Sequence, residues 1–367
     1  MSSPNPTKVL ILCAHRRGRS PSQRYRFEQY LDHLNNFGFE FEFSPLLNAE
    51  DDVLFYATGG FLRKVWILLK TVWIRVMDIR RFASFHIIFI QREAHFLGTS
   101  FFEKRAFRSG AHVIFDFDDS IWLADTSPGN LKWQWVKRPS KFFSNLRYAH
   151  TVLAGNAYLY EKALPYNTSC RIVPTTINTQ WHIPKHELRH GDRICIGWSG
   201  SLSTVKHFEL LLPVLKKLRA LHGHTICIRV ISDKPYTCQG LDIDSQIWSE
   251  DKEVNMLNSF DIGIMPLEDN AWSKGKCGLK ALSYMACEVP VVLSPVGVNS
   301  TLIEHGHTGF LAETEEEWMH YLDLLIQDKS QRLKLGKAGR AFVEKNYSVE
   351  RYKAVYLEVF KHAQSAR

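Results

Sequence analysis

The fold is decided by the stretch SKGKCGLKALSYMACEVPVV, residues 273–292, which leads from a lysine-flanked glycine turn through an apolar segment into a β-branched run. Its spacing predicts a helix over 278–286 and a strand over 289–293. In open α/β sheets, ligands bind beyond the carboxyl ends of the strands, where helix N-termini hold phosphate groups through free backbone N–H groups. The stretch therefore predicts an α/β protein with an anion site where this helix begins.

The residues of this turn fit an anion site, and a second interpretation stays open. Gly275 and Gly278 would let the backbone come close to an anion, while Lys274, Lys276 and Lys280 would add positive charge. The alternative is a solvated, lysine-rich loop in front of an ordinary core helix.

A second stretch of the same half, IGWSGSLSTVKHFELLLPVLKKL (196–218), has a similar layout. A strand leads into a turn with Gly200 and Ser201, and a helix predicted over 205–221 opens near Lys206. One glycine-serine turn is weak evidence for a ligand. Two loop-to-helix sites at corresponding strand ends favour a cradle for a diphosphate.

Strand-like and helix-like segments alternate along the chain, which is typical of parallel sheets. Strands are predicted at 8–14, 39–43, 85–91, 112–117, 151–154, 194–198, 225–231, 261–266 and 289–293. Helices are predicted at 23–38, 61–82, 99–109, 139–149, 205–221, 250–258 and 278–286, twice within 315–345, and at 349–363. A proline-containing linker at 171–192 separates two similar halves. We expect domains at 1–185 and 186–345, a cleft between them, and a C-terminal helix at 346–367 that packs back on the first domain.

Composition limits the partners and the compartment. The 367 residues carry a formal net charge of +8, which favours an anionic partner. The chain lacks a helix-turn-helix, a zinc site and an RNA-stacking motif, so nucleic acid is not expected. The seven cysteines form no CxxC pair, and the N-terminal apolar run is too short for a signal peptide. We therefore expect a cytoplasmic protein.

Acidic and basic residues follow strands of the first half. In VIFDFDDSIWL (113–123), Asp116, Asp118 and Asp119 could bind sugar hydroxyls, act as a base, hold a divalent cation, or cap the next helix. In HRRGRSPSQRYRFEQ (15–29), Arg24 and Arg26 could meet an anionic or sugar acceptor, or belong to a solvated basic loop.

The sequence predicts a basic amphipathic helix over 61–82. A helical wheel gathers its apolar residues, with Trp66 and Trp73 near the border, on one face and its basic residues on the other. Two roles are open for the apolar face: adsorption on an anionic membrane surface, or packing on the sheet of the first domain. Charges interrupt the segment too often for it to span a bilayer.

The second half resembles a known family. The run CGLKALSYMACEVPVVLSPVG is similar to the glycine-Leu and Met-Ala-Cys-Gly-x-Pro-Val-Val signature of glycosyltransferase family 4 (glycosyl transferases group 1), and IEHGHTGFLA (303–312) to its downstream glycine-rich turn. The resemblance covers roughly 190 to 345 and implies the GT-B fold, an α/β architecture of two Rossmann-like domains whose parallel sheets face each other across a cleft.

The resemblance also implies a donor site. The family lysine that binds the donor diphosphate falls on Lys206, whereas Ser201 replaces the family arginine, and Gly275 and Ser283 replace its two glutamates. Lysines 274, 276 and 280 could supply the charge of the missing arginine. The implied donor-binding set is Gly200, Ser201, Lys206, Ser232, Asp233, Lys274, Lys276, Gly278, Lys280, Ser283 and Glu304.

In the first half the resemblance places Asp118 and Asp119, with Lys206, in the catalytic set. The predicted acceptor-binding residues are Arg24, Arg26 and Asp116. The resemblance implies a retaining transfer from a UDP- or GDP-sugar to a glycan or lipid-linked acceptor, without a metal or other cofactor, in the synthesis of surface polysaccharides or glycoconjugates. Peripheral attachment to the inner face of a membrane through 61–82 belongs to this expectation. The alternative is a catalytically inactive nucleotide-binding or scaffold protein with the same fold.

Overall fold

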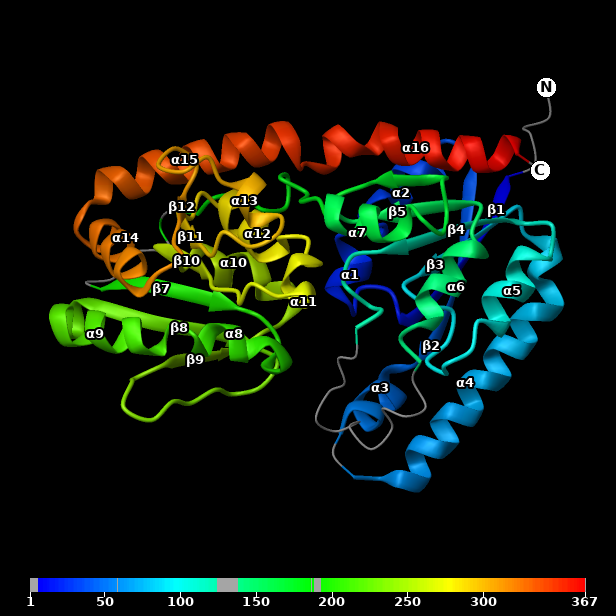
Figure 1. Cartoon of the computed structure of the whole chain (residues 1–367), viewed down its shortest axis with the longest axis horizontal. Coiled ribbons are helices and arrows are strands. Elements are labelled where there is room, and N and C mark those ends of the chain that lie inside the picture. The colour runs from blue at the N-terminus through cyan, green and yellow to red at the C-terminus, as the bar shows by residue number, and fades with distance from the viewer. Residues whose placement is uncertain (1–5, 58, 124–137, 186, 188–192, 367) are drawn as a thin grey trace. The chain divides into compact units, whose positions relative to one another are not determined.

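The computed structural model describes residues 6–57, 59–123, 138–185, 187 and 193–366. The chain divides into two compact units: unit 1 is Met1–Thr175 with Tyr352–Arg367, and unit 2 is Thr176–Arg351 (Figure 1). Each unit contains a six-stranded sheet whose strands pair in parallel. The predicted α/β class is therefore confirmed.

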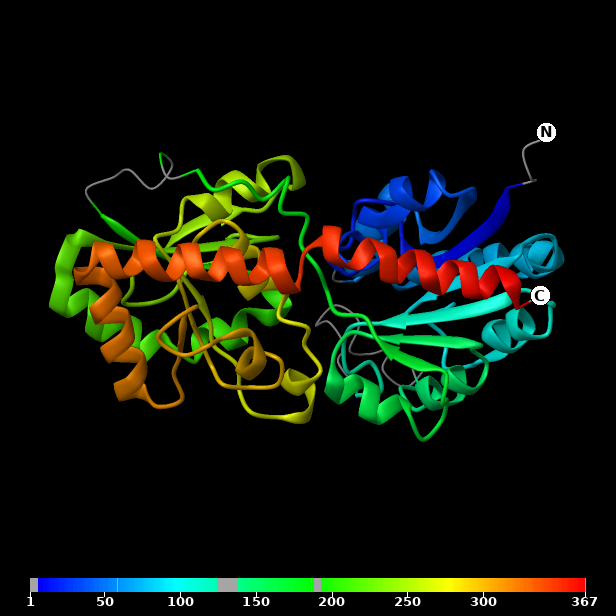
Figure 2. The same ribbon diagram turned by 90° about the horizontal axis from the view of Figure 1, so that it is seen from above.

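Unit 1 has the strand order β2-β1-β3-β4-β5-β6. Its strands are β1 (Thr7–His15), β2 (Phe39–Leu47), β3 (Ile87–Gln91), β4 (His112–Phe117), β5 (Thr151–Ala154) and β6 (Cys170–Ile172). Its helices are α1 (Pro21–Arg24), α2 (Leu31–Asn35), α3 (Ala49–Tyr56), α4 (Phe61–Arg81), α5 (Phe101–Phe107), α6 (Lys141–Arg147), α7 (Ala157–Ala163) and most of α16 (Val349–Ser365). The ring of Phe360 on α16 packs against Phe39 and Phe89, so the C-terminal helix covers this sheet (Figure 2).

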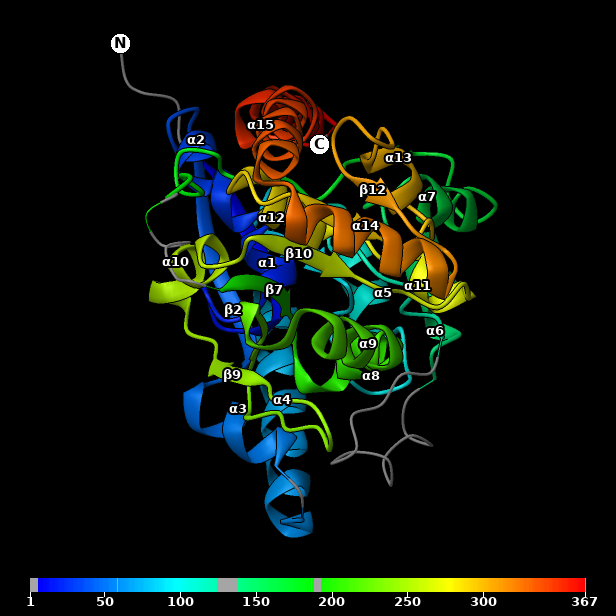
Figure 3. The same ribbon diagram turned by 90° about the vertical axis from the view of Figure 1, so that its left-hand side faces the viewer.

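Unit 2 has the strand order β12-β11-β10-β7-β8-β9. Its strands are β7 (Ile194–Ser199), β8 (Ile226–Ser232), β9 (Asp244–Ile247), β10 (Ile262–Met265), β11 (Val291–Leu293) and β12 (Phe310–Leu311). Its helices are α8 (Val205–Glu209), α9 (Leu212–His222), α10 (Glu253–Asn258), α11 (Ala271–Lys274), α12 (Leu279–Ala286), α13 (Asn299–Leu302), α14 (Glu315–Gln327) and α15 (Lys329–Asn346). Figure 3 shows α8 and α9 on the opposite side of the strands from α12.

Three predicted segments need correction. The helix predicted over 23–38 is broken into α1, a 3-10 turn and α2, and Arg26, between α1 and the 3-10 turn, binds Asp116. The helix predicted over 205–221 is split into α8 and α9, since Pro213 has no N–H to continue the hydrogen bonding of α8. The linker predicted over 171–192 begins inside β6, a strand too short to show a period.

Helix α4 forms where predicted, but its orientation overturns one of its two proposed roles. The side chains that face unit 1 are Lys64, Ile67, Thr71, Arg75 and Asp78, all of them buried. The apolar face points away, and Trp66 and Trp73 are 68% and 63% exposed. The prediction that this apolar face packs on the sheet is therefore wrong. In the part of the chain that the structure describes, no helix has the length and apolar content needed to cross a membrane.

Candidate nucleotide site in unit 2 and charged cluster in unit 1

The site in unit 2 lies where the strand order reverses. From β7 the chain first moves outward to β8 and β9, then returns to β10 on the other side of β7, with Gly263 beside Gly197. At such a switch point the loops beyond two neighbouring strands diverge and leave a crevice for a ligand. The predicted donor residues follow β7 and β10, so the topology brings both stretches to one end of the sheet.

The loop after β7 comes close to Lys280 of α12. A Cβ atom on Gly200 would lie 2.6 Å from the Trp198 ring and 2.8 Å from Cε of Lys280, so only glycine fits here without displacement. Asp233, which follows β8, accepts a hydrogen bond of 2.6 Å from the backbone N–H of Leu202. The loops beyond β7 and β8 are thereby tied together at the predicted site.

The second loop holds its lysines in different surroundings. Gly278 caps α12 with φ of 71°, a left-handed conformation that favours glycine. The Nζ atom of Lys280 lies 5.3 Å from the centre of the Trp198 ring, and Nζ of Lys276 lies 5.4 Å from that of Trp272. Lys274 instead forms an ion pair of 2.9 Å with Asp269. Lys276 and Lys280 thus lie beside tryptophan rings, and Lys274 lies beside a carboxylate.

His207 on α8 lies close enough to these lysines for their charges to affect its pKa. Its side chain is buried, and burial together with the charges of Lys276, Lys280 and Lys206 lowers the pKa of this histidine to about 4. Lys206 on α8, Lys276 in the turn before α12 and Lys280 on α12 therefore all contribute positive charge near His207. This convergence creates the positive potential that a diphosphate requires.

The other predicted donor residues have mixed surroundings. Ser201 and Lys206 are exposed beside the β7 loop, and Glu304 is exposed before the glycine turn at 306–309. Ser232 is buried, and its hydroxyl donates to the carbonyl of Lys234. Ser283 is buried within α12. The hydroxyl groups of these two serines face protein, so neither is displayed to a ligand in this structure.

The carboxyl edge of the sheet in unit 1 carries the predicted aspartates. Arg92, directly after β3, adopts φ of 63°, which is unusual for a residue other than glycine. Its Nε donates a hydrogen bond of 2.7 Å to Asp118, and its Nη2 lies 3.9 Å from Asp119. Ser22 of α1 also donates to Asp118. Arg92 lies in QRE (91–93), a stretch just past a predicted strand that the sequence places in the same class as Arg24 and Arg26, whereas Ser22 was not predicted as a site residue.

These contacts change what Asp118 can do. Burial acts to raise the pKa of this carboxyl group, but the charge and hydrogen bonds of Arg92 outweigh burial and keep the pKa below its ordinary value. Asp118 is therefore ionised at neutral pH and a poor proton acceptor. Its negative charge, rather than its basicity, is what it offers to a bound molecule.

The acceptor prediction for Arg26 and Asp116 is corrected by their burial. Both side chains are fully buried, and the guanidinium group of Arg26 binds Asp116 with two nitrogens and the carbonyl of Val173 with a third. They form an internal ion pair and leave no surface for an acceptor. Arg24 is partly buried, with its guanidinium group 5.1 Å from the centre of the Tyr25 ring.

Sequence reasoning also missed a pair at the end of β1. Nδ1 of His15 lies 3.4 Å from Asp52 of α3, and Nε of Arg19 lies 2.6 Å from the same carboxylate. Burial raises the pKa of Asp52, but His15 and Arg19 lower it to about 2 overall. Helix α3 was not predicted, so no sequence pattern placed Asp52 at this edge. Among the residues that the structure describes, no group of three or more His, Cys, Asp or Glu side chains could hold a metal ion.

Comparison with known proteins agrees with this arrangement. Residues 193–328 match the family model described as glycosyl transferases group 1. The D-inositol 3-phosphate glycosyltransferase of Pseudarthrobacter chlorophenolicus is 32% identical over 105 residues, which cover 28% of this chain and 24% of that protein. That of Stackebrandtia nassauensis is 40% identical over 60 residues, 16% of this chain and 14% of its own length. The chain thus matches about a quarter or less of the length of these relatives.

Solved structures resemble the whole chain. HepE from Anabaena in complex with UDP superimposes with a TM-score of 0.61 at 12% identity, over 97% of this chain and 100% of its own. Sucrose-phosphate synthase from Thermosynechococcus elongatus gives a TM-score of 0.69 at 12% identity, over 99% and 100%. At this identity the likeness concerns the fold. The chain therefore has the GT-B fold, and its segment 193–328 is similar to the glycosyl transferases group 1 family.

Proposed function

We propose that the protein is a glycosyltransferase that moves a sugar from a nucleotide-diphosphate sugar to a hydroxyl group of an acceptor. The observation that carries the proposal is the position of Gly200, Lys276 and Lys280 in the loops and helix start beyond β7 and β10, at the switch point of unit 2, with Lys206 near the start of α8. Structures of HepE, which has the same fold, hold UDP and UDP-glucose. A UDP- or GDP-sugar fits a site that gathers ammonium groups beside helix α12.

The chemistry would be mainly electrostatic. The lysines would stabilise the negative charge that grows on the leaving diphosphate, a task for which no metal is required. The family resemblance implies retention of the anomeric configuration, with Asp118 and Asp119 supplying negative charge toward the sugar or acceptor. A glycan or lipid-linked acceptor is part of the proposal. So are a role in surface polysaccharide or glycoconjugate synthesis and work in the cytoplasm, at the inner face of a membrane.

Calorimetric titration with a panel of UDP- and GDP-sugars tests this proposal. We expect one nucleotide class to bind, and Lys206→Ala to lower turnover far more than it lowers stability, because Lys206 is exposed and its replacement removes no buried contact. Wild-type turnover in Lys206→Ala would contradict the assignment of this lysine. If no nucleotide sugar binds, the proposal fails as a whole.

A second candidate is a nucleotide-binding protein without catalysis. It is favoured by one specific observation: the positions of the two family glutamates carry Gly275 and Ser283, both buried, and so supply no carboxylate. Slow hydrolysis of the bound sugar donor separates the two candidates. A transferase should release free sugar in the absence of acceptor, whereas a scaffold protein should bind the nucleotide sugar and leave it intact.

A further inference from the structure

Helix α4 presents a continuous apolar stripe to the outside of unit 1. Leu62, Trp66, Leu69 and Trp73 are 80%, 68%, 59% and 63% exposed, and Val76 and Met77 extend the same line. Their spacing alternates between four and three residues, which places them along one side of the helix. Isolated exposed apolar residues are ordinary, but a stripe of this length marks an interaction surface.

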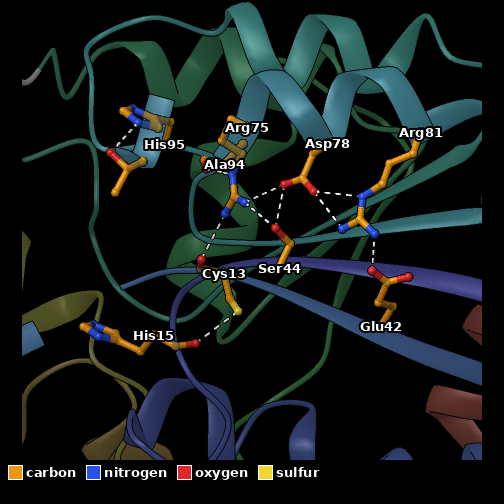
Figure 4. Close-up of polar contacts among 10 residues, drawn as sticks. Cys13, His15, Glu42, Ser44, Arg75, Asp78, Arg81, Ala94 and His95 are labelled. Carbon is orange, nitrogen blue, oxygen red and sulfur yellow. Dashed lines mark hydrogen bonds and ion pairs between the residues drawn. The ribbon is translucent and has the colours of Figure 1, made fainter. Parts of the chain in front are cut away.

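The orientation of α4 is fixed from beneath by polar contacts (Figure 4). Arg75 is fully buried and donates to the backbone carbonyls of Ala94 and Cys13, to Ser44 at 2.9 Å and to Asp78 at 2.8 Å. Asp78 also accepts hydrogen bonds from Arg81. If the helix were rotated to bury its tryptophans, this network would break, and a charged side chain would be left without its partner. The outward direction of the apolar stripe is thus built into unit 1.

The charges of α4 are strongly unbalanced. The helix contains the basic residues Arg63, Lys64, Lys70, Arg75, Arg80 and Arg81 and a single acidic residue, Asp78. Asp78 is buried, whereas Arg63 and Arg80 are exposed, and the partly exposed Lys70 forms an ion pair with Asp51 of α3. The part of α4 that meets solvent therefore combines apolar and basic side chains. Arg63 and Lys70 are neighbours of Trp66 along one flank of the stripe.

We propose that this exposed face of α4 docks on the surface of an anionic lipid bilayer. Leucine and tryptophan side chains would enter the boundary between headgroups and acyl chains, and the basic flank would lie against the headgroups. A second copy of the chain is less suitable, because pairing two α4 faces would bring like charges together. The proposed function enters this inference at one point: it explains why docking would be useful, since a lipid-linked acceptor lies in the membrane.

Co-sedimentation of the full chain with vesicles tests the proposal. The probes are phosphatidylcholine vesicles with and without phosphatidylglycerol, and the variants are Trp66→Ser with Trp73→Ser, and Arg63→Glu with Arg80→Glu. We expect binding to the anionic vesicles only, and a fall of about tenfold or more in each double variant, since apolar burial and charge both contribute. Raised salt should weaken the binding of the wild type.

Two control variants match these changes elsewhere on the surface. Trp181→Ser replaces a tryptophan of unit 2 that is 63% exposed, and Lys334→Glu with Lys337→Glu reverses two exposed charges on α15. Neither control should alter vesicle binding by much. UDP-sugar binding should stay unchanged in the α4 variants, so a failure of membrane docking is distinguishable from a failure of the proposed function.

Three results would overturn the inference. The first is a wild-type chain that does not sediment with anionic vesicles. The second is unchanged vesicle binding in the Trp66→Ser and Trp73→Ser double variant. The third is a loss of self-association in that variant, seen by analytical ultracentrifugation without an effect on vesicles, which would assign the stripe to a second copy of the chain.

Discussion

The carboxyl edges of the two sheets carry charges in opposite arrangements. In unit 2, Lys206, Lys276 and Lys280 have the same sign and act together on buried His207. In unit 1, positive and negative side chains form pairs, as Arg26 and Asp116 do in the interior. Arg92 with Asp118, and Arg19 with Asp52, repeat the arrangement. The two edges occupy equivalent places in similar folds but treat charge differently.

This difference separates charges that hold the fold from charges that await a ligand. The lysines of unit 2 share one sign, and we propose that their charge serves to bind an anionic ligand. Opposite charges tie loops that follow different strands, so the pairs of unit 1 hold its edge together. Substitutions at the two edges should therefore fail in different measurements, stability for unit 1 and nucleotide affinity for unit 2.

The largest effect is expected at the pair of Arg26 and Asp116. Arg26→Met should lower the free energy of unfolding by about 3–5 kcal/mol, because it leaves the Asp116 carboxylate buried without its partner. Urea denaturation followed by circular dichroism measures the loss. The control is Arg171→Met, which breaks an exposed ion pair with Glu358 of the same unit and should cost about 1 kcal/mol or less. Equal losses in both variants would contradict a structural role for the buried pair.

The next effect concerns affinity rather than stability. Lys280→Met keeps most of the side chain beside Trp198 but removes the charge, and should weaken nucleotide-sugar binding about tenfold to hundredfold, the usual worth of a charged hydrogen bond. Calorimetric titration measures the change, with Lys337→Met on α15 as the control. Unchanged affinity would remove Lys280 from the site. A large loss of stability in Lys280→Met would show that this lysine of unit 2 also supports the fold, as the ion pairs of unit 1 are expected to do.

What could be predicted from sequence follows the same division. The lysines around Gly278 and the helix that follows them are local, because loop, helix and strand are consecutive in the chain. Arg26 and Asp116 are 90 residues apart, and no local pattern joins them. Helix α4 shows a further reason for failure. The spacing of its apolar residues separates an apolar face from a polar one. Which face meets the sheet depends on the contacts of Arg75 with Cys13, Ser44 and Ala94, and these residues are distant in sequence.

The burial of His207, together with the charges of the nearby lysines, also predicts a pH dependence of stability. An unfolded histidine has a pKa of about 6.5. The pKa of His207 is about 4 in the folded chain. Between these values the unfolded state binds more protons, so stability falls as the pH is lowered, by up to about 1.4 kcal/mol per pH unit. His207→Gln should remove this contribution.

Urea denaturation of wild type and His207→Gln at pH 7, 6 and 5 measures the difference between them. The matched control is His320→Gln, which replaces an exposed histidine of α14 and should leave the pH dependence as it is in the wild type. Identical pH dependence in His207→Gln and wild type would mean that burial and the three lysines do not lower the pKa of His207 in the folded chain.

The smallest effect compares one backbone position from each unit. In the described part of the chain, Arg92 in unit 1 and Glu288 in unit 2 are the residues other than glycine with positive φ, at 63° and 54°. The family signature has glycine where this chain has Glu288. Glu288→Gly should therefore relieve strain and stabilise the protein by about 0.5–1 kcal/mol, the excess of the left-handed cost over the added chain entropy.

Arg92→Gly gains the same relief but should destabilise the protein by about 1 kcal/mol, because it removes the charged hydrogen bond to Asp118. Thermal unfolding of both variants gives the two signs directly. If Arg92→Gly stabilises as Glu288→Gly does, the ion pair at the edge of unit 1 adds less than the strained backbone costs. Arg92 would then be retained for its role in function and not for its contribution to stability. The same is proposed for the lysines of unit 2.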